Sequence, residues 1–254
     1  MCIVTFNQHQ HSKYKLIIAS NRDEFYERPT APAHFWGDHP SILAGRDLKE
    51  MGTWLGVTKT GRIAILTNFR DLASEQLERK SRGNIAKQFL TSEKEPLALF
   101  EQLQQNKMKY NGFNFVGGTI DQLYHYGNNE LSITSFKPGT YSVSNGPLNV
   151  SWPKTKKAKN MLENYINQDE DIYIDDIFTQ LNDRELAPDH ELPNTGINFE
   201  LERNVSSIFI DREPNYGTKT STVILVTYEN EITFIERTFH HGQYEDEKRF
   251  EFSI

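Results

Sequence analysis

The residue of this sequence best suited to chemistry is Cys2, the only cysteine of the chain, which directly follows Met1. A small residue at position 2 favours removal of Met1, and removal would leave a thiol and a free α-amino group on one residue. An α-amine with an unperturbed pKa near ~8 can take the proton of such a thiol and activate it as a nucleophile. The alternative is that Cys2 is a small buried hydrophobic residue at the head of an apolar strand.

Polar residues that could assist a thiol nucleophile follow apolar segments at three other places. The tetrapeptide Asn21-Arg22-Asp23-Glu24 comes after one apolar run, Asn68 ends another, and Asn145 follows a third. With Cys2 they supply a nucleophile, a cation, two carboxylates and amide side chains. This inventory suits acyl transfer, in which a thiolate attacks a carbonyl carbon, an acid holds an amine and amide donors face the oxyanion. Asn145 lies in an Asn-Gly-Pro sequence and can equally serve as a turn former.

A hairpin at the start of the chain is expected to position the first two of these groups. Residues 3–6 and 14–19 have the composition of strands, and the polar link between them is short. The second run is apolar at nearly every position, which predicts burial on both faces. Residues 21–24 are therefore expected at the end of a buried strand, and residues 28–38, rich in proline and aromatic side chains, are expected to form an ordered loop.

The remainder of the chain alternates between strands and amphipathic helices. A second hairpin is expected around Lys59-Thr60-Gly61, where glycine suits a left-handed turn position. Apolar residues at helical spacing predict helices over 84–90 and 96–108, from residue 154 onward, and over 172–181. Other strands are expected over 53–58, 62–68, 113–119, 122–126, 131–136, 140–144, 205–210, 220–228 and 232–239, before an acidic tail.

The order of these elements indicates the fold class. Strands, two helices, strands, two helices and strands follow one another, and short turns between successive strands make antiparallel pairing the rule. We expect an α+β fold, a four-layer αββα sandwich in which two mostly antiparallel sheets pack face to face between helix layers. No repeat, linker or change of composition marks a boundary, so a single domain over residues 1–254 is expected.

Composition excludes several classes of function. The chain has 254 residues, 37% of them hydrophobic, and a formal charge of −7, which disfavours a nucleic-acid partner. No run approaches the ~18 apolar residues of a membrane span. One cysteine cannot form an intramolecular disulfide or a multi-cysteine metal site, and no metal is expected. The cluster from Lys154 to Lys159 is expected to be a solvated helix face. A cytoplasmic protein with a small-molecule partner and an undefined oligomeric state is the resulting expectation.

Several segments together resemble the NRDE family, also called the transport and Golgi organisation protein 2 family. They are Met1-Cys2-Ile3, residues 19–29 with the tetrapeptide, Gly52-Thr53-Trp54-Leu55-Gly56, Leu66-Thr67-Asn68, Ser144-Asn145-Gly146-Pro147, and Tyr216-Gly217-Thr218 before Ser221-Thr222-Val223. That family is in turn similar to N-terminal-nucleophile hydrolases of the choloylglycine hydrolase and penicillin V acylase type. The resemblance implies the same sandwich and hydrolysis, or acyl transfer, at a carbon–nitrogen bond of a small-molecule acyl amide.

The wider resemblance also implies roles for five residues. Cys2 would be the nucleophile, Arg22 would lie beside the thiolate, and Asp23 would hold the freed α-amino group. Asn68 and Asn145 would together frame the oxyanion hole. Hydrolysis of this kind requires no cofactor.

Two features depart from the hydrolase pattern. The aspartate there falls several residues after the arginine, whereas Asp23 is adjacent to Arg22 and is followed by Glu24. Successive strand residues face opposite sides, so only one of the two acids can point at the thiol, and Asp23 is favoured. A second arginine, expected late in the chain, has no secure match, and Lys219 and Arg203 are the only candidates.

The resemblance has another implication, which gives an alternative function. Members of the transport and Golgi organisation group have been connected with haem handling and with lipid or acyl-CoA homeostasis, so a non-catalytic carrier with haem as its ligand is the alternative. The chain has eight histidines but no Cys-x-x-Cys-His motif. Loop histidines such as His34 and His39 are not expected to be axial ligands. Haem would have to occupy an apolar pocket that the sequence does not reveal.

Overall fold

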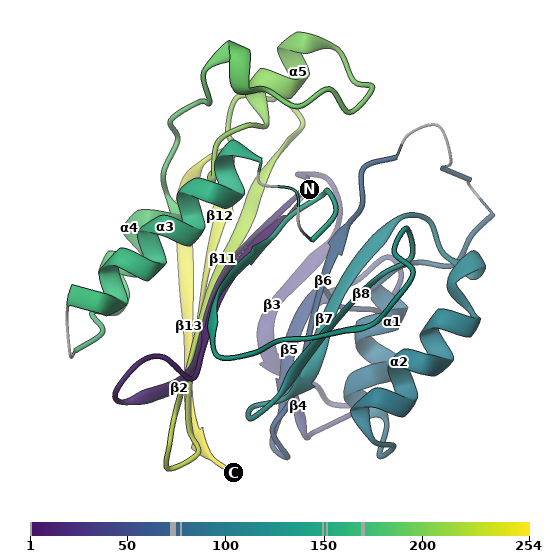
Figure 1. Ribbon diagram of the computed structural model, residues 1–254, viewed down its shortest axis with the longest axis vertical. Helices are drawn as coiled ribbons and strands as arrows, with labels where there is room; N and C mark the ends of the chain where they lie inside the picture. The colour runs from purple at the N-terminus through teal and green to yellow at the C-terminus, as the bar shows by residue number, and fades with distance from the viewer. Residues whose placement is uncertain (1, 72–74, 77, 149, 151, 169–170) are drawn as a thin grey trace.

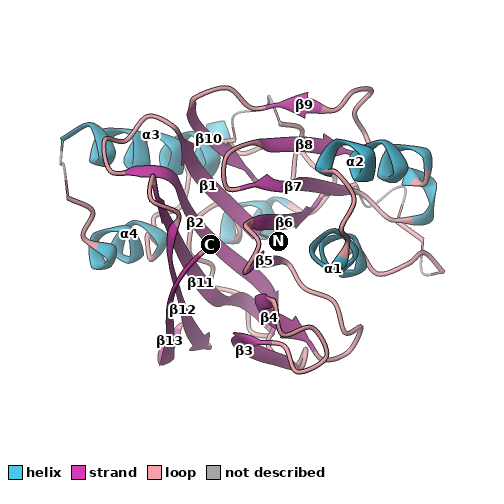
Figure 2. Ribbon diagram, turned by 90° about the horizontal axis from the view of Figure 1, so that it is seen from below, coloured by secondary structure: helices cyan, strands magenta, loops and turns pink. Residues whose placement is uncertain are grey.

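The computed structural model describes residues 2–71, 75–76, 78–148, 150, 152–168 and 171–254. Two antiparallel sheets pack face to face, and helices cover the outer face of each (Figure 1). Seen from below, the same four layers follow one another, with α3 and α4 on one side and α1 and α2 on the other (Figure 2). The expected α+β fold, a four-layer αββα sandwich, is confirmed.

The first sheet carries both ends of the described chain. Its six strands lie in the order β10 (Gly139–Val143), β1 (Cys2–Gln8), β2 (Tyr14–Phe25), β11 (Tyr216–Thr227), β12 (Glu231–His240) and β13 (Gln243–Ser253). The expected hairpin forms between β1 and β2. As expected, residues 21–24 lie at the end of a largely buried strand, since β11 pairs with β2 as far as Phe25.

The second sheet is formed by the middle of the chain. Its seven strands lie in the order β3 (Thr30–Phe35), β4 (Ile42–Asp47), β5 (Leu55–Thr58), β6 (Arg62–Asn68), β7 (Phe113–Thr119), β8 (Leu123–Gly127) and β9 (Thr134–Ser135). The expected turn between β5 and β6 has Gly61 at a φ of 81°. The expectation of a loop over residues 28–38 was wrong, since β3 forms there. An edge position and a bulge between Ala31 and His34 accommodate Pro32.

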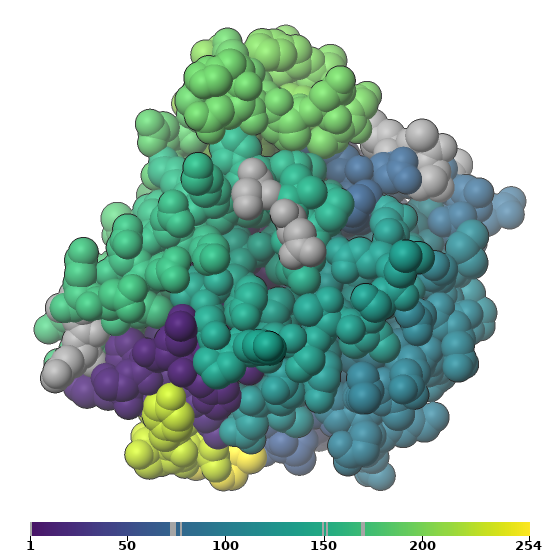
Figure 3. All heavy atoms as spheres, in the orientation of Figure 1, coloured from purple at the N-terminus to yellow at the C-terminus, as the bar shows by residue number. Residues whose placement is uncertain are grey.

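Five α-helices lie in the described part of the chain. They are α1 (Gly83–Thr91), α2 (Pro96–Gln105), α3 (Pro153–Gln168), α4 (Ile174–Leu181) and α5 (Phe199–Asn204). On α3 the buried apolar residues Ala158, Leu162 and Ile166 recur at helical spacing and face the first sheet. The segment around α5 forms a rounded projection at one end of the molecule (Figure 3).

The hydrophobic core consists of three clusters. Side chains alternate between the two faces of a strand, so neighbouring residues of one strand belong to different clusters. Val4 and Phe6 of β1 belong to the cluster between the two sheets, together with residues of the second sheet such as Ile63 and Ile65. Ile3 lies in the cluster between the first sheet and helices α3 and α4. A third cluster lies between the second sheet and α1 and α2. Burial on both faces explains why residues 16–19 of β2 are all apolar.

Two expectations for the last quarter of the chain were wrong. Residues 205–210 form no strand, although most are buried, because their backbone bonds go elsewhere: the Phe209 N–H donates to the Asp183 carbonyl. The acidic tail is the edge strand β13, which Phe250 and Phe252 hold in place by packing against Phe35 of β3.

Candidate active site

The hairpin of β1 and β2 brings Cys2 next to Arg22. The two residues are directly opposed in the antiparallel register, so their side chains lie on the same face, at the Cβ spacing of about 5 Å typical of such pairs. By alternation with Val4 and Phe6, this is the face that looks into the space between the sheets. The Cys2 carbonyl accepts a hydrogen bond of 2.8 Å from the Ser144 hydroxyl, which fixes the start of β1.

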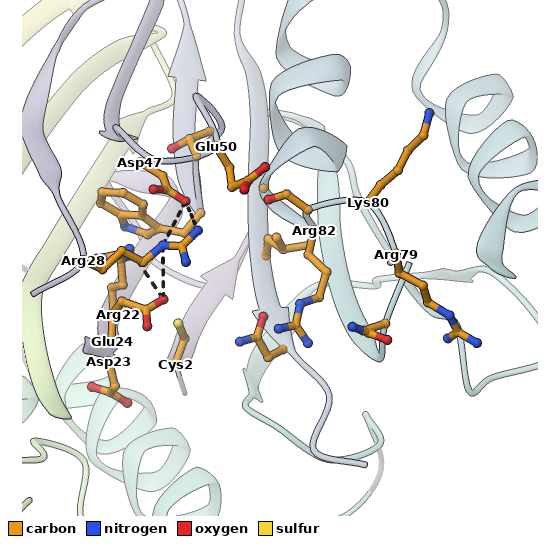
Figure 4. A pocket seen from close by; sticks show the side chains of 17 residues that line it. Cys2, Arg22, Asp23, Glu24, Arg28, Asp47, Glu50, Arg79, Lys80 and Arg82 are labelled. Atoms are coloured by element: carbon orange, nitrogen blue, oxygen red, sulfur yellow. Dashed lines mark hydrogen bonds and ion pairs between the residues drawn. The ribbon is translucent and has the colours of Figure 1, made fainter. Parts of the chain in front are cut away.

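Cys2 lines a pocket of about 270 Å³ at one end of the sandwich. The wall combines residues of β2, β4 and β6 with residues 79–83, which lead into α1. Charged side chains dominate it, and Figure 4 shows the Cys2 sulfur between Arg22, Glu24, Arg28 and Asp47 on one side and Arg82 on the other.

The thiol of Cys2 is held mainly in its protonated form. Desolvation raises its pKa above the ordinary value, and the charge of Asp23 adds to that rise. The Asp23 backbone N–H donates toward the sulfur and the Arg22 charge lies near, and both act in the opposite direction without reversing the shift. Because the thiolate is the reactive form, chemistry at this sulfur needs a base that removes its proton.

Arg22 is fixed by an aromatic ring and by polar neighbours. Its guanidinium lies over the Trp54 ring at 4.2 Å, which is a cation–π contact. It donates to the Thr30 hydroxyl at 3.3 Å and lies 3.8 Å from the Glu24 carboxylate. The side chain is buried. Trp54 of the Gly-Thr-Trp-Leu-Gly segment therefore orients the cation that lies beside the thiol.

Asp23 and Glu24 point in opposite directions, and both line the Cys2 pocket. Glu24 shares the face of Arg22 and Cys2, whereas Asp23 faces the α3 layer and accepts a 2.7 Å hydrogen bond from the Thr218 hydroxyl (Figure 4). Desolvation raises the pKa of the buried Asp23 carboxyl, and Lys154, Thr218 and Arg22 each lower it in part. Asp23 still acts on Cys2, through its charge and its backbone N–H.

The two asparagines occupy different places. Asn68, at the end of β6, lines the pocket. Asn145 is fully buried outside the lining, and its side-chain nitrogen donates to the Asn68 carbonyl at 2.7 Å. Within the described residues, no hydrogen bond engages the Asn68 side-chain amide. The arrangement leaves Asn68 able to donate into the pocket, while Asn145 holds the backbone of Asn68.

The first residue of the tetrapeptide has a structural role. The Asn21 side-chain nitrogen donates to the carbonyls of Leu181 and Ile208, and its oxygen accepts from the Ser221 hydroxyl at 2.6 Å. Asn21 thus connects β2 to the end of α4, to the segment before β11 and to β11 itself.

Lys154 was expected on a solvated helix face, and that expectation was wrong. It is buried in the first turn of α3, where its ammonium donates to the Val205 carbonyl at 3.2 Å. Desolvation lowers its pKa to about 8, although the Asp23 charge acts in the opposite direction. Helical spacing alone gave no signal of this burial, because the segment 199–205 that covers Lys154 is remote in sequence.

Sequence reasoning also missed the charged residues on the pocket wall. Arg28 forms a 2.6 Å ion pair with Asp47, and Arg79 and Arg82 come from a segment that carried no recognisable pattern. The two candidates for a late cation lie outside the lining. Lys219 donates to the carbonyls of Tyr26 and Arg28, and Arg203 pairs with Asp189 at 3.1 Å on the surface.

The described residues offer neither a metal-binding cluster nor a helix that could span a membrane. No group of three or more histidine, cysteine, aspartate or glutamate side chains there is placed to hold a metal ion. None of the helices in this part of the chain combines the length and the apolar character that crossing a membrane requires.

Comparison with known proteins places the chain among relatives. Residues 1–241 match the sequence model of the family described as Transport and Golgi organisation 2. The Transport and Golgi organization protein 2 homologs of Bos taurus and Homo sapiens are 36% and 34% identical, over 94% of this chain and 93% of each relative. The Drosophila melanogaster protein is 28% identical over 96% of this chain and 95% of its own length.

A solved structure of similar fold is the C2A variant of the conjugated bile acid hydrolase from Clostridium perfringens. It superimposes with a TM-score of 0.58 at 10% sequence identity and covers 100% of this chain and 97% of that chain. The N-terminal-nucleophile hydrolase sandwich that the sequence resemblance implied is therefore the fold of this protein. By its sequence, the chain belongs to the Transport and Golgi organisation 2 family.

Proposed function

We propose that this protein is an N-terminal cysteine amidohydrolase, or acyltransferase, that acts on a small-molecule acyl amide. The observation that carries the proposal is the register of β1 and β2, which sets Cys2 opposite Arg22 in one pocket. Asn68, whose amide has no hydrogen bond to another described residue, lines the same pocket, and so does Asp23. These groups are what an acyl-transfer site requires at the points where charge develops.

The proposed reaction begins with removal of Met1. The freed α-amino group takes the proton of the Cys2 thiol, and the Asp23 carboxylate stabilises the resulting ammonium. The sulfur then forms a bond to the carbonyl carbon of the amide, and the oxyanion accepts a hydrogen bond from Asn68. Collapse breaks the carbon–nitrogen bond, and the leaving amine takes the proton from the ammonium. Water, or an acceptor amine, finally attacks the thioester and regenerates the thiol.

The pocket favours this proposal over the carrier alternative. A haem or lipid carrier needs a predominantly apolar cavity, whereas charged side chains dominate the lining of the Cys2 pocket. The Clostridium perfringens protein of similar fold is a conjugated bile acid hydrolase. Titration with haem tests the alternative directly: a saturable, shifted Soret band at one equivalent would favour a carrier, and an unshifted spectrum would count against it.

Intact mass and thiol reactivity test the proposal. We expect the purified chain to be lighter by one methionine and to react with iodoacetamide at its single thiol. A matched control inserts glutamate between Met1 and Cys2, which blocks removal of Met1 and keeps the thiol without its own α-amine. That control should fold, react slowly with iodoacetamide and hydrolyse none of a panel of acyl amides that the processed chain hydrolyses.

Two results would overturn the proposal. One is quantitative retention of Met1 in cells. The other is hydrolysis of the acyl amide panel by the Cys2→Ala variant at the rate of the wild type.

A further inference from the structure

The charges of the Cys2 pocket divide into two sets. On one side Arg28 pairs with Asp47 at 2.6 Å and lies 3.9 Å from Glu24, which is also 3.8 Å from Arg22. The cations and anions on this side neutralise one another, and the exposed Glu50 adds negative charge that acts on Arg28. On the other side, residues 79–83 add cations only (Figure 4).

Of the two arginines on that side, Arg82 makes fewer hydrogen bonds to other described residues. Its guanidinium donates to the Gly112 carbonyl at 3.1 Å and lies 3.6 Å from the exposed carboxylate of Glu75, a long ion pair. A guanidinium has five N–H donors, so these contacts with described residues engage only some of them. Arg79 is more fully engaged, by Gln76 and by the Tyr110 carbonyl, and Lys80 extends away from the pocket (Figure 4).

Arg82 is also close to the reactive sulfur. Desolvation lowers the pKa of Arg82, which is only partly exposed, while Glu75, Glu24 and a Cys2 thiolate act in the opposite direction. Arg82 and Cys2 line the same pocket, and the Cys2 sulfur lies between Arg22 and Arg82 (Figure 4). A partly desolvated guanidinium with donors that no described residue engages is well suited to hold a carboxylate or phosphate by paired hydrogen bonds.

Backbone packing fixes Arg82 relative to the rest of the site. The Thr53 N–H donates to the Gly83 carbonyl at 3.3 Å, and a Cβ added to Gly52 would lie 2.6 Å from the Gly83 carbonyl carbon. The next residue, Trp54, holds Arg22. The segment 52–54 thus joins the side of the pocket that carries Arg82 to the side that carries Arg22.

We propose that Arg82 binds an anionic group of the substrate, a carboxylate or a phosphate, so that the preferred substrates of the Cys2 site are negatively charged acyl amides. This inference rests on the proposed function and adds the substrate class. The side of the pocket on which Arg28 pairs with Asp47 faces the uncharged part of the substrate. Arg82 supplies the positive charge that binds its anionic end. Arg82 is a specificity-determining residue and takes no part in bond breaking.

Matched substrate pairs test this assignment. An N-acylglycine is compared with its neutral carboxamide, and an N-acylethanolamine phosphate with the free alcohol, which separates carboxylate from phosphate. We expect the wild type to prefer the anionic member of at least one pair. Arg82→Gln should raise KM for that anion by about ten- to hundredfold, the usual value of a hydrogen bond to a charged group, and leave kcat/KM of its neutral partner unchanged.

Two further variants separate binding from structure. Arg82→Lys keeps the positive charge but loses the paired N–H donors of the guanidinium, and it should retain part of the preference for anionic substrates. Lys87→Gln removes a charge from α1 outside the pocket lining and should behave as the wild type. Equal losses on charged and neutral substrates in Arg82→Gln, or a wild type indifferent to substrate charge in both pairs, would overturn the proposal.

A binding experiment distinguishes this proposal from the proposed function. Inorganic phosphate and acetate are tested for protection of the wild-type Cys2 thiol from iodoacetamide. Protection that Arg82→Gln abolishes and Lys87→Gln retains, without hydrolysis of any amide, would support the anion site and count against the hydrolase. Hydrolysis without anion protection and without a charge preference would support the hydrolase and overturn the anion site.

Discussion

At the scale of single residues, the site separates side chains that could act on a substrate from those that hold others in place. Asn68 and Asn145 both follow strands and were predicted to act as a pair. The Asn145 side-chain amide donates to the Asn68 backbone carbonyl. The Asn68 side-chain amide has no hydrogen-bond partner among the described residues. The oxyanion role of both residues remains a prediction, and the geometry favours Asn68 as the donor.

This difference predicts opposite effects of two substitutions. Asn68→Ala should melt near the wild type, because no hydrogen bond of its side chain is lost, but should lower turnover by about 10²–10³-fold if it is an oxyanion donor. Asn145→Ala leaves the partly buried Asn68 carbonyl without this donor and should lower the free energy of unfolding by about 1–3 kcal/mol. Urea unfolding and amide turnover measure the two effects. A stable Asn145→Ala variant with lost turnover would reverse this assignment.

The sequence alone was enough to predict the positions of some residues of the site but not of others. The approach of Cys2 and Arg22 follows from one hairpin, and a short link determines its register. Arg82 reaches the pocket only because Gly52 and Gly83 pack together, a contact between segments that no local pattern connects. The burial of Lys154 likewise depends on a distant segment.

At the scale of elements, the segment between β4 and β5 connects both sides of the pocket. Gly52 packs against the first residue of α1 without room for a side chain, and Trp54 lies beneath Arg22. The glycine and the tryptophan of the Gly-Thr-Trp motif therefore have different structural roles. One permits the close approach of a helix, and the other orients a cation.

Gly52→Ala should push the start of α1 away from the sheet. The added Cβ would lie 2.6 Å from a backbone carbon of Gly83, and overpacking of this kind costs about 1–3 kcal/mol. We expect a lower melting temperature and a reduced charge preference of the Cys2 site. Gly37→Ala is the matched control, since its Cβ would meet no atom within 4 Å, and it should melt at or slightly above the wild type. Equal melting temperatures for the two variants would contradict the packing argument.

At the scale of the whole molecule, the layers were predictable, but one edge strand of each sheet was not. Continuous apolar runs such as 14–19 predicted strands buried on both faces, and helical stripes supplied the outer layers. The edge strands β3 and β13 escaped prediction because neither has a strongly apolar sequence. Each is held by the other, through Phe35, Phe250 and Phe252, across more than two hundred residues of chain.

One buried carboxyl group also joins the two sheets. Glu236 of β12 accepts a 2.7 Å hydrogen bond from the Ala33 N–H of β3, and it is almost fully buried. Desolvation raises its pKa to about 7, although the Ala33 N–H, the Arg22 charge and Thr222 act in the opposite direction. The contact between the sheets therefore carries a group that titrates near neutral pH.

The stability of the sandwich should depend on pH through Glu236. Its pKa is near 4.5 when unfolded and about 7 when folded, so between these values the folded chain binds the extra proton. The free energy of unfolding from this group therefore falls as pH rises through that window, by a total on the order of 3 kcal/mol. Glu236→Gln cannot lose the proton, so it should gain stability relative to the wild type between pH 5 and pH 8 in urea unfolding. Glu231→Gln, on the exposed start of the same strand, should show no such change. A stability difference between wild type and Glu236→Gln that stays constant over this range would mean that folding does not raise the pKa of Glu236.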